Sequence, residues 1–158
     1  MAAAWLSALR HALVTVHLIK LCVGIDTVRQ LEEFRALRRE EYWRQGLEQV
    51  DVHVTRNAPR RAEEVLDNGS LYWVIRRQIR VRQRILRIEE LRDDEGGRRC
   101  GLVLDPALVR TEPRAFRPFQ GWRYFKPEDA PADLAGASDD TDDMPEDMRR
   151  ELRTLGLL

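Results

Sequence analysis

Residues 68–86, NGSLYWVIRRQIRVRQRIL, bring together the side chains best suited to contact a nucleic acid. Arginine binds phosphate through paired hydrogen bonds and stacks on nucleobases. Read as a strand, the segment places four arginines on the face that carries Tyr72, because alternate residues of a strand share a face. The arginines are Arg76, Arg80, Arg82 and Arg84. This face predicts contact with phosphates and bases.

Two other segments add cations and aromatic rings. Arg60 and Arg61 open a short predicted helix, whose N-terminus itself favours phosphate. Residues 114–124 alternate arginines with aromatic residues, the pattern that single-stranded RNA requires. The leading prediction is a non-catalytic RNA-binding module. Its contact residues are Arg60, Arg61, Tyr72, Arg76, Arg80, Arg82, Arg84, Arg117, Trp122 and Arg123.

An ordinary sheet with one charged, solvated face fits the same residues. Trp73 and Trp122 would then belong to the core, and the arginines would form ion pairs with acidic neighbours such as Glu63, Glu89 and Glu90. The sequence leaves both interpretations open.

His53 is the candidate for catalysis, as a general base on the polar face of its strand near Arg56, although an exposed histidine on a strand is more often merely solvated. An enzyme acting on RNA or a nucleotide would use His53 or Tyr72 as acid or base. The sequence has no glycine-rich phosphate loop and no metal-ligand spacing, so it predicts no cofactor and no metal. A third hypothesis is a protein-interaction domain whose contact is PFQGWRYF, residues 118–125.

The charges are unevenly distributed along the chain. Arginine and lysine together balance aspartate and glutamate at 27 each, and only two of the basic residues are lysines. Residues 56–126 are strongly basic, whereas residues 127–158 are strongly acidic. The acidic tail either lies across the basic surface, where it competes with polyanions, or is simply solvated. The sequence predicts one globular domain over 14–134 and an acidic tail with a short terminal helix over 135–158.

Apolar runs and helix signals predict the first half of the fold. Residues 16–23 form a buried strand, and Thr27 caps a helix over 27–45. Residues 50–55 alternate strictly, so we expect the valines to face the core and Asp51, His53 and Thr55 to face solvent. A short helix over 60–66 follows.

The second half reads mostly as strands. Residues 71–88 form a long strand with a bend or bulge near 77 and 84, where the apolar phase slips; a helix is the alternative. A hairpin turn at 93–97 leads into a strand over 100–105, a proline-rich loop and a last strand over 119–125. The expected fold is α+β: a small, curved, mostly antiparallel sheet or partly closed β-barrel with two flanking helices.

Several stretches resemble one bacterial family, domain of unknown function 1489: VTVHLIKLCVGI, PRRAEEVLDNGSLYWVI, RQRIL, LVLDPALV and PFQGWRYFKPEDAPADL. The resemblance covers about residues 14–134 and implies no particular activity, cofactor or substrate. In that family the position of Arg77 is usually glycine, which implies a bend there. The order of elements is also similar to PUA-like and ASCH-like small barrels, many of which bind RNA.

The remaining expectations concern the start of the chain and its location. Residues 1–13 read as an extension or a poorly ordered arm, without the pattern of an export signal or a membrane span. Cys22 and Cys100 lie in apolar contexts and are expected to be buried free thiols of a cytoplasmic protein. The oligomeric state and any protein partner are left open.

Overall fold

The computed structural model describes residues 15–134 and 146–157. The prediction for residues 1–13 and the part of the predicted acidic tail over 135–145 lie outside this part of the chain. The strands are β1 (His17–Leu21), β2 (Asp51–Thr55), β3 (Ser70–Ile75), β4 (Gln78–Arg92), β5 (Arg98–Leu104), β6 (Val109–Ala115) and β7 (Trp122–Phe125). The helices are α2 (Val28–Arg44), α3 (Ala62–Leu66) and α4 (Glu146–Thr154), with a 3-10 turn, η1, at Pro127–Asp129.

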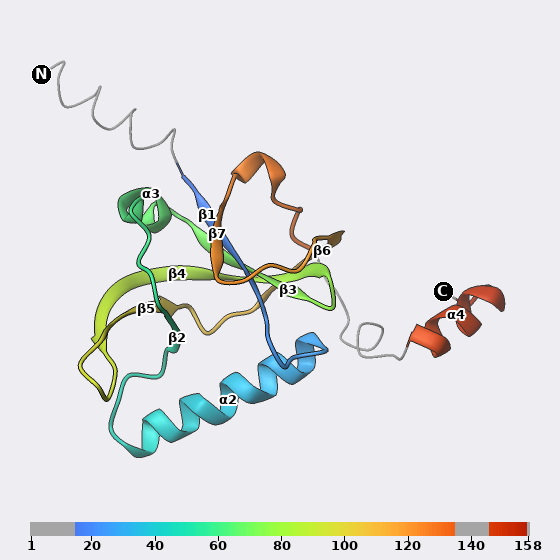
Figure 1. Ribbon diagram of the computed structural model, residues 1–158. Helices are drawn as coiled ribbons and strands as arrows, with labels where there is room; N and C mark the ends of the chain where they lie inside the picture. Colours follow the sequence, from blue (N-terminus) through green and yellow to red (C-terminus); the bar gives the residue numbers. More distant parts are fainter. Residues whose placement is uncertain (1–14, 135–145, 158) are drawn as a thin grey trace, which may run out of the picture.

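One curved sheet contains all seven strands, and its main path runs β2-β5-β4-β3-β1-β7 (Figure 1). Every pairing is antiparallel except that of β1 with β3. The predicted α+β class with a curved, mostly antiparallel sheet is therefore confirmed. The sheet does not close into a barrel, because in the described residues no strand pairing joins the outer strands β2 and β7.

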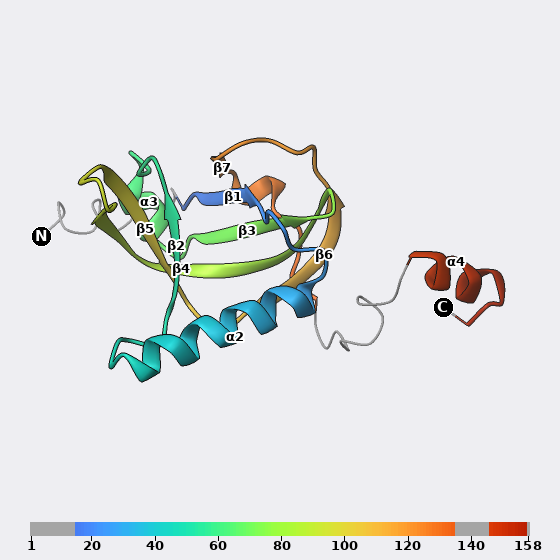
Figure 2. The same ribbon diagram turned by 60° about the horizontal axis from the view of Figure 1, so that its bottom comes forward.

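The long strand β4 holds the two ends of this sheet together. Its first half pairs with β3 on one edge and with β6 on the other, and its second half pairs with β5. Register shifts occur near Arg80 and Leu86, where the strand bends. The bend turns the β5–β2 end of the sheet back toward β1 and β7 (Figure 2).

Helix α2 begins where the sequence predicts. The Thr27 side chain accepts a hydrogen bond from the backbone N–H of Gln30 at 3.0 Å, which satisfies one donor of the first turn. The helix lies along one side of the sheet (Figure 2) and buries Val28, Leu31 and Arg35. Arginine in this buried row means that α2 packs through a charge as well as through apolar contacts.

The sheet is covered on both faces. The larger core lies inside the curve, around Leu18, Leu71 and Trp73, and includes residues from α2, α3 and β5. A smaller core lies on the outer face, where Tyr72 and Phe125 pack against residues from the segment 116–130. All six residues of β3 are buried for this reason.

A buried hydrogen-bond network joins α2 to the sheet. Asp51 accepts from the Arg39 guanidinium at 2.8 Å and from the Gln83 side-chain amide at 2.7 Å. Gln83 also donates to the Asp105 carbonyl oxygen and accepts from the Trp73 indole N–H at 2.9 Å. Buried polar groups are costly unless they are paired, and here each partner belongs to a different element.

The expected phase of β2 is wrong. Asp51 is 2% exposed and Thr55 is also buried, whereas Val54 is 51% exposed. The alternating pattern predicts the opposite phase because valines usually face the core. The rule fails here because the network around Asp51 satisfies a buried carboxylate, and the side of the strand that carries it turns inward.

The predicted single strand over 71–88 is two strands joined by a tight turn. Arg76 and Arg77 both have positive φ, 50° and 63°, which is the pattern of a type I′ hairpin turn. The bend expected near 77 is thus a chain reversal, and the helix alternative is excluded. Strand β6 was missed, because Pro106, Pro113 and Pro118 suggested a loop; Pro113 lies in an exposed stretch of β6.

We expect Asp51→Ala to destabilise the protein by about 3 kcal/mol, because the variant leaves the Arg39 guanidinium and one N–H of the Gln83 amide without their acceptor. Urea unfolding measures the change. The control is Glu33→Ala, which removes an exposed ion pair with Arg29 and should cost less than about 0.5 kcal/mol. Equal losses in the two variants would show that the buried network stabilises the protein no more than an exposed ion pair does.

Arg77→Gly should stabilise the protein by about 0.5 to 1 kcal/mol. A left-handed conformation costs a side-chain-bearing residue roughly 1 to 2 kcal/mol, and glycine's greater freedom when unfolded offsets part of the relief. Arg98→Gly, at an exposed position of β5 with extended backbone, is the matched control and should destabilise. Thermal unfolding should show a higher midpoint temperature for Arg77→Gly and a lower one for Arg98→Gly. A lower midpoint for Arg77→Gly would show that the positive φ of Arg77 is not strained.

A candidate binding site at the open seam of the sheet

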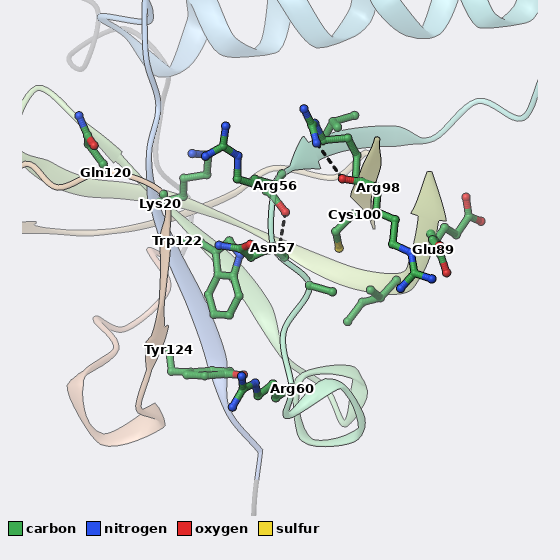
Figure 3. A pocket seen from close by; sticks show the side chains of 17 residues that line it. Lys20, Arg56, Asn57, Arg60, Glu89, Arg98, Cys100, Gln120, Trp122 and Tyr124 are labelled. Carbon is green, nitrogen blue, oxygen red and sulfur yellow. Dashed lines mark hydrogen bonds and ion pairs between the residues drawn. The ribbon is translucent and has the colours of Figure 1, made fainter. Parts of the chain in front are cut away.

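The gap between the outer strands β2 and β7, here called the seam, holds a solvent-open pocket of about 1100 Å³. Ligand pockets commonly measure ~300–1,000 Å³, so the space suffices for a ligand of nucleotide size. Strand β7 and β1 form one wall, and the β2–α3 loop with β5 and the second half of β4 forms the other (Figure 3). The polar and aromatic lining side chains include Lys20, Arg56, Asn57, Arg60, Glu89, Glu90, Arg98, Arg99, Gln120, Trp122 and Tyr124.

Two hydrogen bonds bridge the walls of the seam. The Trp122 indole N–H donates to the backbone carbonyl of Asn57 at 2.9 Å. The Tyr124 hydroxyl accepts from the backbone N–H of Arg61 at 3.1 Å, and the Arg61 guanidinium lies 5.3 Å from the centre of the same ring. Side chains of β7 thus hold the β2–α3 loop across a gap that no strand pairing closes within the described residues.

Positive charge exceeds negative charge in the pocket, and part of it is uncompensated. Arg98 pairs with Glu90 and Arg99 pairs with Asp93. In the described part of the chain, the side chains of Lys20, Arg56 and Arg60 have no hydrogen-bond or ion-pair partner. Burial lowers the pKa of Lys20, so its ammonium sits where water compensates it less fully. These three cations are open to an anionic or carbonyl ligand.

The predicted row of arginines, at the β3–β4 turn and in the first half of β4, already has partners within the protein. Arg82 forms a two-pronged ion pair with Asp133, at 2.7 and 2.8 Å, and also donates to Ser70. Arg84 donates to Asn68 at 2.8 Å. Arg80 contacts Gln78. Arg76 lies 3.6 Å from Asp26, at the hairpin turn. Each arginine of the predicted row therefore already contacts an acceptor within the protein, near in sequence for Arg80 and far for Arg82.

The other residues of the predicted RNA surface divide between the seam and elsewhere. Arg60 and Trp122 line the pocket, and Arg61 lies beside it on Tyr124. Arg117 is exposed on the loop before β7, and Arg123 stacks on Phe119 at 4.5 Å. Tyr72 is 4% exposed and packs edge-on against Phe125 in the outer core. The prediction that Tyr72 is exposed is therefore wrong, because the segment 116–130 covers its ring.

His53 faces the interior instead of solvent. Its ring packs edge-on against Trp73 at 5.0 Å, and its Nε2 is buried without a hydrogen-bond partner in the described structure. Burial, followed by the positive charges of Arg35, Lys20 and Arg38, lowers the pKa of His53 to about 3. A base this weak is poorly matched to proton abstraction near neutral pH.

Other chemical groups add little to the site. In the part of the chain that the structure describes, no three His, Cys, Asp or Glu side chains lie close enough together to hold a metal ion. Cys22 and Cys100 are buried free thiols, as expected, and burial raises the pKa of both. The helices of the described residues lack the length and apolar character to cross a bilayer.

Residues 18–158 match the family described as "Protein of unknown function (DUF1489)". The chain belongs to this family. The match confirms the resemblance seen in the sequence motifs and extends it through the acidic tail to the last residue. No curated protein and no solved structure matches the chain.

The sequence pointed to only part of the seam in this family member. The predicted nucleic-acid contacts do not include Lys20, Arg56, Asn57 and Tyr124, which come from β1, the β2–α3 loop and β7, far apart in sequence. A local signal for Tyr124 existed, since it is two residues from Trp122 and therefore on the same face of β7. Nothing local marks Lys20, which lies inside an apolar run.

His53 should make the native state sensitive to acid. Its pKa is depressed, so between pH 6.5 and about 3 the unfolded chain binds a proton there that the native protein does not. Neutral His53 therefore costs the native state nothing above pH 6.5, and the free energy of unfolding falls as the pH drops through this window. Between pH 7 and pH 4, we expect the free energy of unfolding to fall by about 2 to 3 kcal/mol more in the wild type than in His53→Gln.

Urea unfolding at a series of pH values measures this difference. His17, whose pKa is also lowered, is present in both proteins and cancels from the comparison. Parallel pH profiles for wild type and His53→Gln would show that His53 titrates normally.

Proposed function

We propose that the seam pocket binds single-stranded RNA, and that the protein is a non-catalytic RNA-binding module of the cytoplasm. The observation that carries the proposal is the presence of three unpaired cations and two aromatic rings in one open pocket. Phosphates need cations that are not already neutralised by the protein, because binding is driven by the release of counterions from the nucleic acid.

The charges available to phosphates favour the seam over the arginine row of β4. Arg56 and Arg60 are exposed and unpaired in the described structure, and they lie on the loop that forms one wall. Arg82 would first have to give up a two-pronged pair with Asp133. An existing charge-assisted pair lowers the net gain from a new phosphate contact.

The aromatic rings supply the second requirement, a surface on which bases stack. Trp122 is half-buried and Tyr124 is exposed, and their rings meet edge-on at 5.0 Å on the wall opposite the cations of the β2–α3 loop (Figure 3). Stacking on such rings contributes roughly 1–3 kcal/mol per base and tolerates any sequence. A single strand has free base faces, whereas a duplex does not.

Catalysis is not part of the proposal. His53 is buried and a weak base, and burial raises the pKa of Tyr72, so neither of the two predicted acid–base residues is suited to proton transfer at neutral pH. The protein-interaction hypothesis stays a prediction; its contact segment, residues 118–125, forms β7 and the loop beside the pocket.

The test is the double variant Arg56→Ala/Arg60→Ala. We expect it to bind a fluorescein-labelled single-stranded RNA decamer at least tenfold more weakly in anisotropy titrations. Its affinity should also depend less on salt, because each phosphate contact contributes about 0.7 to the logarithmic slope for single strands. Two lost contacts flatten the slope by roughly 1.4.

The matched control is Arg29→Ala/Arg44→Ala, which removes the same number of charges from the exposed face of α2. A loss shared by both double variants would mean that net charge, not the seam, attracts RNA. Arg82→Ala/Arg84→Ala reports on the β4 row; a larger loss there than at the seam would move the binding surface to that row. Absence of RNA binding by the wild type would overturn the proposal.

A further inference from the structure

Lys20 occupies a place in the pocket that sets it apart from the arginines. In the sheet register it lies opposite Trp73 of β3 on one side and opposite Trp122 of β7 on the other. Side chains at paired positions of neighbouring strands point to the same face. The three residues therefore form a row, Trp73–Lys20–Trp122, which runs from the inner core to the edge of the seam.

The two indole groups of this row have their hydrogen bonds satisfied by the protein. Trp73 donates to Gln83 at 2.9 Å, and Trp122 donates to the Asn57 carbonyl at 2.9 Å. The Lys20 ammonium has no such partner in the described structure, although the residue is half-buried. Burial also lowers its pKa, as expected for a cation that lacks a nearby acceptor. Its three donors are the unused polar groups of the row.

An ammonium group donates hydrogen bonds and cannot accept them. A nucleobase that enters the pocket beside Trp122 would present its polar edge to Lys20. Uracil presents a carbonyl oxygen at the position where cytosine presents an amino group, and guanine differs from adenine in the same way. A carbonyl oxygen satisfies the ammonium, whereas an amino group places two donors against each other.

We propose that Lys20 is a specificity-determining residue that selects a keto base, uracil or guanine, over the amino bases cytosine and adenine in the seam pocket. This inference rests on the proposed RNA binding and adds the identity of the base. Asn57 and Gln120, which also line the pocket, carry amide side chains that offer both a donor and an acceptor. They can pair with either kind of base, and the donor-only side chains of Arg56 and Arg60 are assigned to phosphates, so the choice of base is assigned to Lys20.

The experiment compares uridine and cytidine decamers, labelled with fluorescein, in anisotropy titrations at pH 7.5 and fixed salt. Both are pyrimidine single strands with the same backbone charge. Wild type should bind the uridine decamer about tenfold more tightly, which corresponds to roughly 1.4 kcal/mol. Lys20→Met keeps the length of the side chain and removes the donors. It should bring the two affinities within about twofold, mainly by weakening the uridine complex.

Two further variants keep the result interpretable. Lys126→Met removes the other lysine of the chain, which is exposed and outside the pocket, and should preserve the tenfold preference. Lys20→Arg retains a donor-only cation and should restore part of the preference, and it serves as the folded comparison if Lys20→Met unfolds.

The outcomes separate the inference from the proposed function. Equal affinity of wild type for the two decamers, or a preference that survives in Lys20→Met, would overturn the role of Lys20 while RNA binding stands. Absence of binding to both decamers would overturn the proposed function and the inference together. A preference for cytidine would show that an acceptor, and not the ammonium, faces the base.

Discussion

The buried carboxylate of Asp51 is the interaction on which the arrangement of this protein depends. It receives hydrogen bonds from Arg39 of α2 and from Gln83 of β4, and Gln83 in turn binds Trp73 of β3 and the backbone at Asp105. One charged group thus fixes the helix, three strands and the end of β5. Such a group is tolerated only with its partners in place, so the network favours one packing of α2 on the sheet over slipped alternatives.

The same network determines which side chains of β2 face the seam. Because Asp51 points inward, His53 and Thr55 follow it, and Val54 turns outward into the pocket wall. Strand β2 then ends in the loop that carries Arg56, Asn57 and Arg60 across from β7. The open edge of the sheet is held by Trp122 and Tyr124 instead of by a strand ladder, which leaves room for a ligand between the two walls.

Local signals in the sequence were sufficient for much of the fold. The Thr27 cap, the hairpin turn at 93–97 and the apolar run of β1 each correspond to an observed element. Failures arose where distant residues decide the outcome. The phase of β2 depends on partners in α2 and β4, and the pairing of β6 with β4 overrides the prolines that suggested a loop.

The candidate site shows the same limit. The sequence identified where arginines are abundant, but it did not reveal which of them the fold already neutralises. Arg82 finds Asp133, 51 residues away, and Arg84 finds Asn68. Arg60 and Trp122, which the sequence predicts as contact residues, both line the pocket, yet nothing in the sequence places Lys20 between the two tryptophans until the strands are paired.

The position of β1 between β3 and β7 also has a consequence for biosynthesis. Strand β1 precedes both of its sheet neighbours in the chain: β3 begins only at Ser70, and β7 begins only at Trp122. Contacts between residues so distant in sequence form slowly. During synthesis β1 therefore stays unpaired until β3 has been made, and the wall of the seam that β1 and β7 form is complete only once β7 follows.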